Sequence, residues 1–250
     1  MLYPPTPMSS DAERARQMAH HREADPDHLA WQTAGPYFAE TEAALLADVR
    51  CERGERLLEI GCGEGANLHH LRRVDGARFG VDFSLEKAQA ARTSGALVAC
   101  ADATRLPVGD AAFDVVLVRD LLHHVPARLE VLREAARVLR PGGRLHLIEP
   151  NARAPLVVLQ ALTVRAERGL LRSTERRLRE ELAAAGFDDL RFAAAQPFPI
   201  WRLALHPRFG RPRLGAAPRV RAALDLLDAT AARVVPKSAW LYLCFTARRP

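Results

Sequence analysis

The chain has 250 residues, of which 48% are hydrophobic and 26% charged. This length suits one α/β domain with additions, and it is sufficient to bury a full hydrophobic core. The net charge of +6 comes almost entirely from arginine, because Lys87 and Lys237 are the only lysines. No dense basic run marks a nucleic-acid-binding arm, so we expect no nucleic-acid partner.

The four cysteines are scattered along the chain and contain no CxxC pair. This spacing argues against a zinc site and against a disulfide framework, so we expect no metal and a reducing compartment. No apolar run approaches the roughly 20 residues of a membrane span. The N-terminus also lacks the apolar core of a secretion signal, and the expected location is cytoplasmic.

In chain order, residues 1–10 are rich in proline and serine and are expected to be disordered, and residues 11–50 are expected to be helical. Short apolar segments then alternate with amphipathic ones. We expect strands at 56–60, 77–81, 97–99, 115–118 and 145–148, with helices at 67–73, 85–93 and 128–139. This alternation predicts a parallel sheet covered on both faces, which is a doubly wound α/β fold.

Beyond residue 150 the pattern is less regular. Helices are expected at 154–171, from a Ser173-Thr174 cap to residue 185, and at 220–235. Strands are expected at 189–194 and 239–247. Between these two strands lies an insertion, about residues 196–237, that combines arginines with aromatic side chains.

The first strand leads directly into a loop with glycines at 61, 63 and 65. Such a turn between a buried strand and a helix is typical of nucleotide-binding α/β domains, where a ligand lies against bare backbone. With Ala66 the loop also fits the GxGxxA pattern of dinucleotide sites. Asp82 ends the second strand, where a carboxylate can bind ribose hydroxyls in either class. The loop and Asp82 therefore predict an adenosine ribose and leave the rest of the ligand open.

Three further features bear on the ligand. Glu59 precedes the loop, and a carboxylate there suits a ligand with a sulfonium and an amino group better than a pyrophosphate. Asp102 follows the third strand, where it can accept a hydrogen bond from an adenine amino group while the next N–H, of Ala103, donates to the ring. The Pro-Gly-Gly at 141–143 predicts a sharp turn between a helix and the fifth strand.

The ordered series LLEIGCGEG, GVDFS, ADATRLP, FDVVLVRDLLHHV and VLRPGGRLHLIEP resembles the class I S-adenosylmethionine (SAM)-dependent methyltransferases, in their small-molecule type 11 group, over about residues 40–150. The resemblance implies a Rossmann-like, seven-stranded sheet whose last strand is antiparallel. It implies an N-terminal helical lid over 11–50 and a SAM-binding domain over 51–250 that carries the insertion as a cap. The cofactor contacts that we expect on this basis are Glu59, Gly61, Cys62, Gly63, Asp82, Phe83, Asp102, Ala103 and Arg119.

Candidates for the chemistry lie just past the fourth strand. Methyl transfer is an in-line displacement, and a base helps where the acceptor must lose a proton. Asp120, His123 and His124 are the catalytic candidates, because ligands of such sheets collect at the carboxyl ends of the strands. The alternative for either histidine is a buried hydrogen bond that holds a loop. Glu149, at the end of the fifth strand, is a candidate for the rim of the pocket.

Acceptor specificity is expected from the parts outside the shared core. The apolar stretch 155–159 and the arginine-rich insertion favour a lipophilic or anionic small molecule, with O- or C-methylation preferred. The insertion could instead be a solvated cap edge, a homodimer contact or a peripheral contact with an anionic membrane. The aromatic residues Trp31, Tyr37 and Phe38 either close over the ligands or pack beneath a helix.

Two other classes of function remain as alternatives. An NAD(P)-binding oxidoreductase is disfavoured by Glu59 and Asp102, and by the lack of a Tyr-x-x-x-Lys pair. A catalytically silent, methyltransferase-like binding module is disfavoured by the intact set of candidate ligand contacts. A nucleic-acid methyltransferase would carry an Asn/Asp-Pro-Pro-aromatic motif after the fourth strand, where this chain has Arg119-Asp120-Leu121-Leu122.

Overall fold

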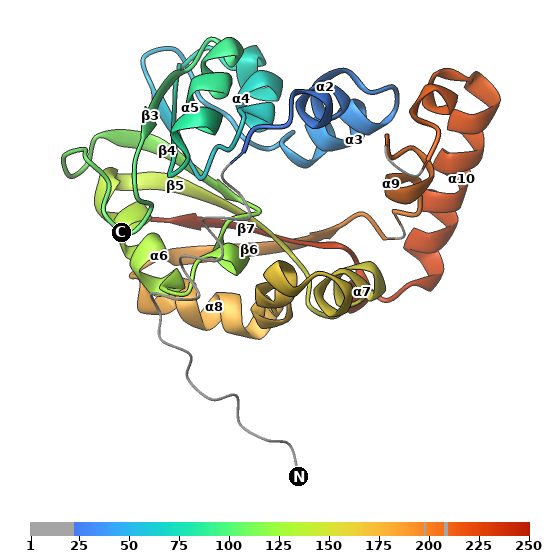
Figure 1. The fold of residues 1–250 in the computed structure, drawn as a ribbon. Coiled ribbons are helices and arrows are strands. Elements are labelled where there is room, and N and C mark those ends of the chain that lie inside the picture. Colours follow the sequence, from blue (N-terminus) through green and yellow to red (C-terminus); the bar gives the residue numbers. More distant parts are fainter. Residues whose placement is uncertain (1–22, 198, 208–209) are drawn as a thin grey trace.

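A seven-stranded sheet forms the centre of the computed structural model, which describes residues 23–197, 199–207 and 210–250 (Figure 1). The strands are β1 (Arg56–Ile60), β2 (Ala77–Asp82), β3 (Leu97–Cys100), β4 (Phe113–Arg119), β5 (Leu139–Pro150), β6 (Asp188–Ala195) and β7 (Tyr242–Arg248). Their order is β3-β2-β1-β4-β5-β7-β6, and β7 is antiparallel to both of its neighbours. The predicted doubly wound sheet with an antiparallel last strand is confirmed. The tail expected to be disordered, residues 1–10, lies outside the described residues.

The two faces of the sheet are both buried, as expected for an α/β fold. Leu57 and Val115 point into one hydrophobic cluster, whereas their neighbours Leu58 and Val116 point into the other. The first cluster includes residues of α4 (Ala66–His70), η1 (Leu71–Arg73), α5 (Leu85–Ala91) and α7 (Pro155–Thr163). The second includes residues of α6 (Arg128–Val138) and α8 (Glu175–Ala184). Strands covered in this way consist of nearly continuous apolar runs, which explains why the sequence pattern located them.

The fifth strand differs from its prediction. The Pro-Gly-Gly at 141–143 was expected to form a turn before the strand, but β5 begins at Leu139 and contains these residues. Leu139 pairs with Phe113, and the next pair is Arg144 with Val115, so the extra residues form an irregularity inside the strand. Gly142, with φ of 76°, takes the left-handed conformation that this bulge requires. Arg249 supplies a carbonyl oxygen to the Gly142 N–H at 2.8 Å, which replaces the missing ladder partner.

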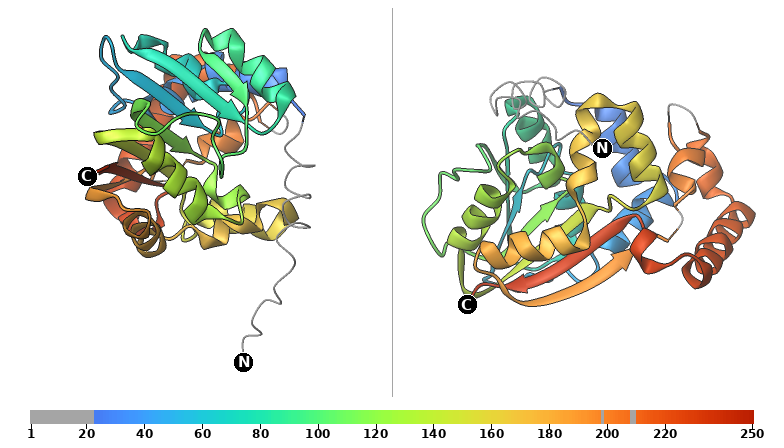
Figure 2. Two further views of the ribbon diagram at one scale, coloured as in Figure 1. Left: turned by 90° about the vertical axis from the view of Figure 1, so that its left-hand side faces the viewer. Right: turned by 90° about the horizontal axis from the view of Figure 1, so that it is seen from below.

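The N-terminal helices contact the insertion at one end of the molecule (Figures 1 and 2). The helices are α2 (Pro26–Ala34) and α3 (Phe38–Leu45), and the insertion contains α9 (Trp201–Ala204), η5 (Pro212–Ala216), α10 (Pro218–Val234) and η6 (Lys237–Ala239). Phe38 stacks on Trp31 with ring centroids 3.5 Å apart and meets Trp201 edge-on at 5.5 Å. Tyr37 also contacts Trp201, at 5.9 Å. The aromatic residues of α2 and α3 therefore pack against the insertion.

Candidate functional site

The order of the strands reverses at β1: β2 and β3 lie on one side of it, and β4 and the later strands lie on the other. Open α/β sheets bind ligands beyond the carboxyl ends of the strands at such a point. The glycine loop lies there: the N–H groups of Gly61 and Cys62 donate to the carbonyl oxygen of Val81 at 2.8 and 2.9 Å. Gly61, Gly63 and Gly65 have φ values of 77°, 51° and 88°, so the loop needs residues that tolerate positive φ. The loop thus lies tightly against the end of β2.

Glu59 is wholly buried beneath this loop. Its Oε1 accepts a hydrogen bond of 2.6 Å from Asn67 Nδ2, whereas its Oε2 has no hydrogen-bond partner among the residues that the structure describes. Burial raises the pKa of the carboxyl to about 8. Buried polar atoms are normally paired, so a free oxygen here marks a place for a donor from a ligand.

Asp82 and Asp102 lie at the ends of the neighbouring strands β2 and β3, which pair directly through Asp82 and Cys100. The two oxygens of Asp82 accept hydrogen bonds from the backbone N–H groups of Gly63 and Ser84, each at 2.9 Å. Burial raises its pKa. Ser84, not Asp82, caps α5. Phe83, between them, is half-buried.

The Asp102 side chain closes a local turn. Its Oδ1 accepts from the N–H and the hydroxyl of Thr104, at 3.0 and 2.8 Å. Asp102 and Ala103 are both half-buried, so their polar groups remain within reach of a ligand. Cys62 is buried, and burial raises the pKa of its thiol, which agrees with the expectation of a filler and not a nucleophile.

Arg119 is buried at the end of β4 and belongs to a charge network that the sequence did not suggest. Its Nη1 donates to Asn67 Oδ1 at 2.9 Å, and its Nη2 forms an ion pair with Glu42 of α3. Arg202 of the insertion binds the other oxygen of Glu42 at 2.8 Å and donates to the hydroxyl of Tyr242 at 3.1 Å. Although burial opposes ionisation, the two arginines hold the pKa of Glu42 below its usual value. Arg119 was expected to contact the cofactor, and in this structure its guanidinium binds Glu42 and Asn67.

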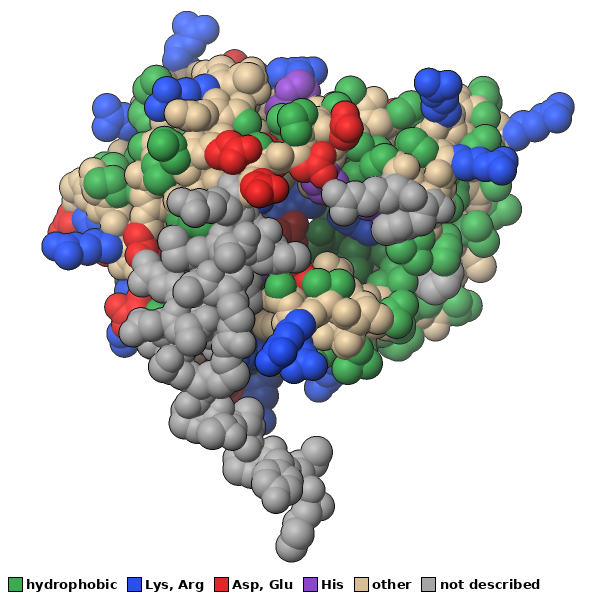
Figure 3. Space-filling model, in the orientation of Figure 1, with side chains coloured by type: hydrophobic (Ala, Val, Ile, Leu, Met, Phe, Trp, Pro, Cys, Tyr) green, Lys and Arg blue, Asp and Glu red, His purple; other side chains and the backbone are tan. Residues whose placement is uncertain are grey.

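Asp120 follows Arg119 in a strained conformation with φ of 51°. Its Oδ2 accepts from the hydroxyl of Tyr242 at 3.3 Å and lies 3.3 Å from Arg119 Nε. The side chain is 39% exposed, so the carboxylate is open to solvent at the end of β4. Figure 3 shows the surface hollowed near the middle of one face, with charged side chains inside and hydrophobic ones along one wall. Loss of hydration at this carboxyl group, together with the nearby Glu149 and Glu42, raises the pKa of Asp120.

His123 is buried and anchored through its Nδ1, which lies 2.9 Å from Glu149 Oε2. Glu149 is itself wholly buried, and its Oε1 accepts from the N–H groups of Leu121 and Leu122, both at 2.8 Å. Burial favours the neutral ring, but the adjacent carboxylate outweighs it and raises the pKa of His123. Glu149 therefore fixes both the loop after β4 and the orientation of this ring.

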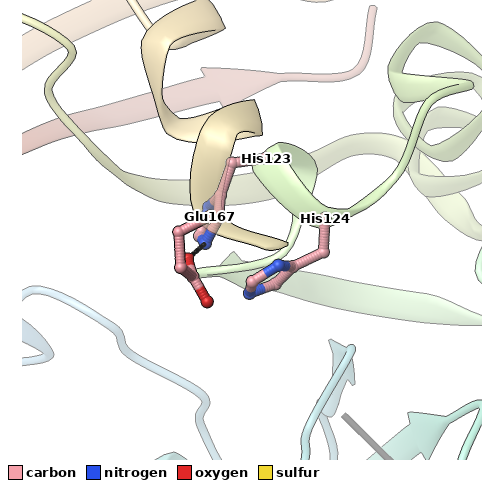
Figure 4. Close-up of side chains that lie close together, drawn as sticks. All are labelled: His123, His124 and Glu167. Atoms are coloured by element: carbon pink, nitrogen blue, oxygen red, sulfur yellow. Dashed lines mark ion pairs between the residues drawn. The ribbon is translucent and has the colours of Figure 1, made fainter. Parts of the chain in front are cut away.

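His124 is half-buried, and its ring lies against His123 with centroids 3.9 Å apart. Glu167 lies beside both rings and comes from η4 (Arg165–Arg172), which follows α7 in the chain (Figure 4). The distance between His123 Nε2 and Glu167 Oε2 is 3.8 Å. These three side chains form the group within the described residues that could hold a metal ion.

The structure thus brings the predicted strand-end residues together and adds others that sequence reasoning missed. Those missed are Glu42, Asn67, Glu167, Arg202 and Tyr242. Asn67 could have been found, because it lies in the first turn of the helix that follows the glycine loop. The others lie in segments whose position depends on packing far along the chain, and no local signal marks them.

The fold and the position of the site define a Rossmann-like domain with its ligand site at the switch point of the sheet. Residues 58–147 match the family model described as a methyltransferase domain. The 27-O-demethylrifamycin SV methyltransferase of Amycolatopsis mediterranei is 37% identical over 137 residues, covering 51% of this chain and 49% of that protein. The demethylmenaquinone methyltransferase of Mycobacterium tuberculosis is 35% identical over 106 residues, covering 42% and 45%.

Among solved structures, geranyl diphosphate C-methyltransferase from Streptomyces coelicolor has a similar fold, with a TM-score of 0.67 and 16% identity over 100% of both chains. The aligned part spans about half the length of the curated relatives. The matched region, residues 58–147, is a methyltransferase domain of the class I SAM-dependent type, whose cofactor is S-adenosylmethionine. No helix among the described residues is long and apolar enough to cross a membrane.

Proposed function

We propose that the protein transfers a methyl group from SAM to a small, hydrophobic acceptor. The observation that carries this proposal is Glu59, a carboxylate wholly buried beneath the glycine loop whose Oε2 lacks a donor among the described residues. Leaving a buried acceptor unpaired costs about 1–3 kcal/mol. The amino group of the methionine part of SAM would supply the donor. A pyrophosphate carries only acceptor oxygens and would supply no donor here, which disfavours a dinucleotide.

Around the methionine part, we assign direct contact to the backbone of Gly61 and Gly63, with Cys62 filling the loop beneath it. Glu59 would accept from the amino group. Arg119 acts through Asn67, which it binds at 2.9 Å and which in turn binds Glu59 at 2.6 Å. We therefore propose Arg119 as a positioning residue in place of a direct contact.

Around the adenosine part, Asp82 would bind the ribose hydroxyls. Each of its oxygens accepts one backbone hydrogen bond and retains a further lone pair. Phe83 follows it beside the adenosine. Asp102 would accept from the adenine amino group, and the N–H of Ala103 would donate to a ring nitrogen.

SAM, when bound, supplies a methyl group already activated on a sulfonium sulfur. The chain must hold the acceptor in line with that methyl group and exclude water. Asp120 is the proton acceptor that we favour, because its side chain is partly exposed at the carboxyl end of β4 and its pKa is raised. His123 is held by Glu149 at one nitrogen, and its neighbour His124 is the more exposed of the two rings.

A lipophilic acceptor is supported by exposed apolar side chains on α7, the helix that precedes η4. Leu159 and Leu162 of α7 are 55% and 70% exposed, so this helix presents apolar surface. The names of the relatives specify demethylmenaquinone, 27-O-demethylrifamycin SV and geranyl diphosphate, three molecules with large apolar parts. We propose O- or C-methylation of a molecule of this kind.

Calorimetric titration of the full chain with SAM, S-adenosylhomocysteine and NADH tests the cofactor. We expect binding of the first two only, and at least tenfold weaker SAM binding by Glu59→Gln. Glu52→Gln is the matched control, because Glu52 is an exposed glutamate of the loop before β1. Absence of SAM binding would contradict the proposal. SAM binding without methyl transfer to a panel of phenols, quinols and prenyl compounds would favour a binding module.

A further inference from the structure

We propose that His123, His124 and Glu167 bind a divalent transition-metal ion. Each residue offers one ligand atom, and these atoms all lie within 4.8 Å of one another. Metal–nitrogen and metal–oxygen bonds of about 2.1 Å place neighbouring ligand atoms roughly 3–4 Å apart. The distance of 3.8 Å between His123 Nε2 and Glu167 Oε2 already lies in this range.

The chemistry of the three ligands indicates the class of metal. Imidazole suits zinc, copper, iron and nickel better than magnesium, calcium or manganese, which prefer sets of oxygen atoms. Three protein ligands leave at least one coordination position open, as in catalytic and not structural sites. His124 is the most exposed of the three ligands, so the open position is reached from its side.

Glu149 gives His123 the orientation that a metal ligand needs. It binds His123 Nδ1 at 2.9 Å, which leaves Nε2 directed at Glu167. A carboxylate behind a coordinating histidine fixes the ring and increases its basicity. Glu149 is in turn held by two backbone N–H groups and by the hydroxyl of Ser173 at 3.3 Å. The ring therefore sits in a supported position before any ion binds.

The two segments that carry the ligands are packed in direct contact. A Cβ atom on Gly169 would lie 1.8 Å from the carbonyl oxygen of His123, so the backbone of η4 touches that of η3 (Leu122–His124). This close approach places Glu167 over both histidines, as Figure 4 shows. The cluster therefore depends on tertiary packing, although its two histidines are adjacent in sequence.

The position of the cluster suggests what the ion would do, and this role rests on the proposed function. The cluster follows β4, and the methyl acceptor would lie beyond the carboxyl end of this strand. An ion there would bind an oxygen of the acceptor and so select molecules with a hydroxyl, carbonyl or phosphate oxygen next to the methylated atom. Metal binding itself requires neither cofactor nor acceptor.

The test uses the full chain, freed of metal by a chelator, without SAM or acceptor. We expect calorimetric titration with Zn²⁺ to show one site, and Co²⁺ to give the visible absorption of a nitrogen- and oxygen-ligated ion. Mg²⁺ should bind at least tenfold more weakly. His124→Ala and Glu167→Gln should each weaken Zn²⁺ binding at least tenfold, whereas His69→Ala, on α4, should leave it unchanged. Circular dichroism and thermal unfolding of each variant show whether the protein is folded.

Zn²⁺ affinity that is the same in the wild type, His124→Ala and Glu167→Gln would overturn the proposal, as would the absence of Zn²⁺ binding. Lower thermal stability of Glu167→Gln at unchanged Zn²⁺ affinity would show that the cluster only supports the fold. Failure to bind SAM would instead contradict the proposed function, and the metal titration would still be interpretable.

Discussion

Glu59 combines two properties that rarely occur together in a residue with a purely structural role. It is wholly buried, and burial raises its pKa to about 8, yet one of its oxygens has no partner among the described residues. Two neighbours offset the cost of burying this carboxyl group only in part. Asn67 donates a hydrogen bond to the other oxygen, and Arg119 contributes positive charge from a distance. Such a group destabilises the ligand-free protein, and ligand-binding sites commonly retain costs of this kind.

This cost predicts a pH dependence of stability. Between about pH 4.5 and 8 the native protein binds a proton at Glu59 that the unfolded chain has already lost. The free energy of unfolding of the ligand-free protein should therefore fall as pH rises through this range, by up to about 1.4 kcal/mol per pH unit from this group. Glu59→Gln removes the contribution. Urea unfolding at about pH 5.5 and 7.5 measures how the stability of each protein changes with pH. Subtracting the change in Glu59→Gln from that in the wild type cancels the contributions of other groups, such as Asp82. Parallel pH profiles of the two proteins would contradict the prediction.

The candidate site was only partly predictable at the level of residues. Glu59, Asp82, Asp102 and Asp120 all lie at or just past the carboxyl ends of strands. These ends converge in a parallel sheet, so the positions of the residues along the chain were enough to group them. Glu167 gave no such signal. Its position depends on where η4 packs, and that depends on contacts with the loop after β4.

At the level of elements, the stretch after β5 shows where periodicity was insufficient. One helix was expected over residues 154–171, but α7 ends at Thr163 and η4 begins at Arg165. The hydroxyl of Thr163 donates to the carbonyl oxygens of Leu159 and Gln160, which competes with the helical hydrogen bonds there. The chain then turns so that Gly169 meets His123. Apolar spacing cannot reveal this break, because both parts carry apolar residues.

The contact between η4 and η3 makes Gly169→Ala a sensitive substitution. The new Cβ would lie 1.8 Å from the carbonyl oxygen of His123, so the backbone of one segment must move. Overpacking of this kind costs about 1–3 kcal/mol. Gly109→Ala is the control, since its Cβ would meet no atom within 4 Å, and it should change stability by less than about 0.5 kcal/mol. Equal effects of the two substitutions in urea unfolding would show that the contact is less tight than the structure indicates.

At the level of the whole molecule, one buried ion network joins parts that are distant in sequence. Glu42 of α3 binds Arg119 at the end of β4 and Arg202 of the insertion. The aromatic contacts of Phe38 with Trp31 and Trp201 also hold the N-terminal helices against the insertion. The sequence predicted the sheet, because buried strands have continuous apolar runs, but it could not predict that the insertion folds back onto the N-terminal helices. Long-range charge pairing of this kind leaves no local pattern.

This network leads to the last prediction, which compares two glutamates of α3. Glu42→Gln leaves Arg119 and Arg202 buried without their shared partner, and removal of one member of a buried ion network costs about 3–5 kcal/mol. Glu40 forms an ion pair with Arg221, but the Glu40 side chain is 63% exposed, so Glu40→Gln should cost less than about 1 kcal/mol. Urea unfolding of both variants, with SAM titration as a second measurement, tests the difference. We also expect Glu42→Gln to weaken SAM binding, because Arg119 supports Asn67 and thereby Glu59. If the two substitutions lowered stability equally, Glu42 would not be the connection between the N-terminal helices, the sheet and the insertion.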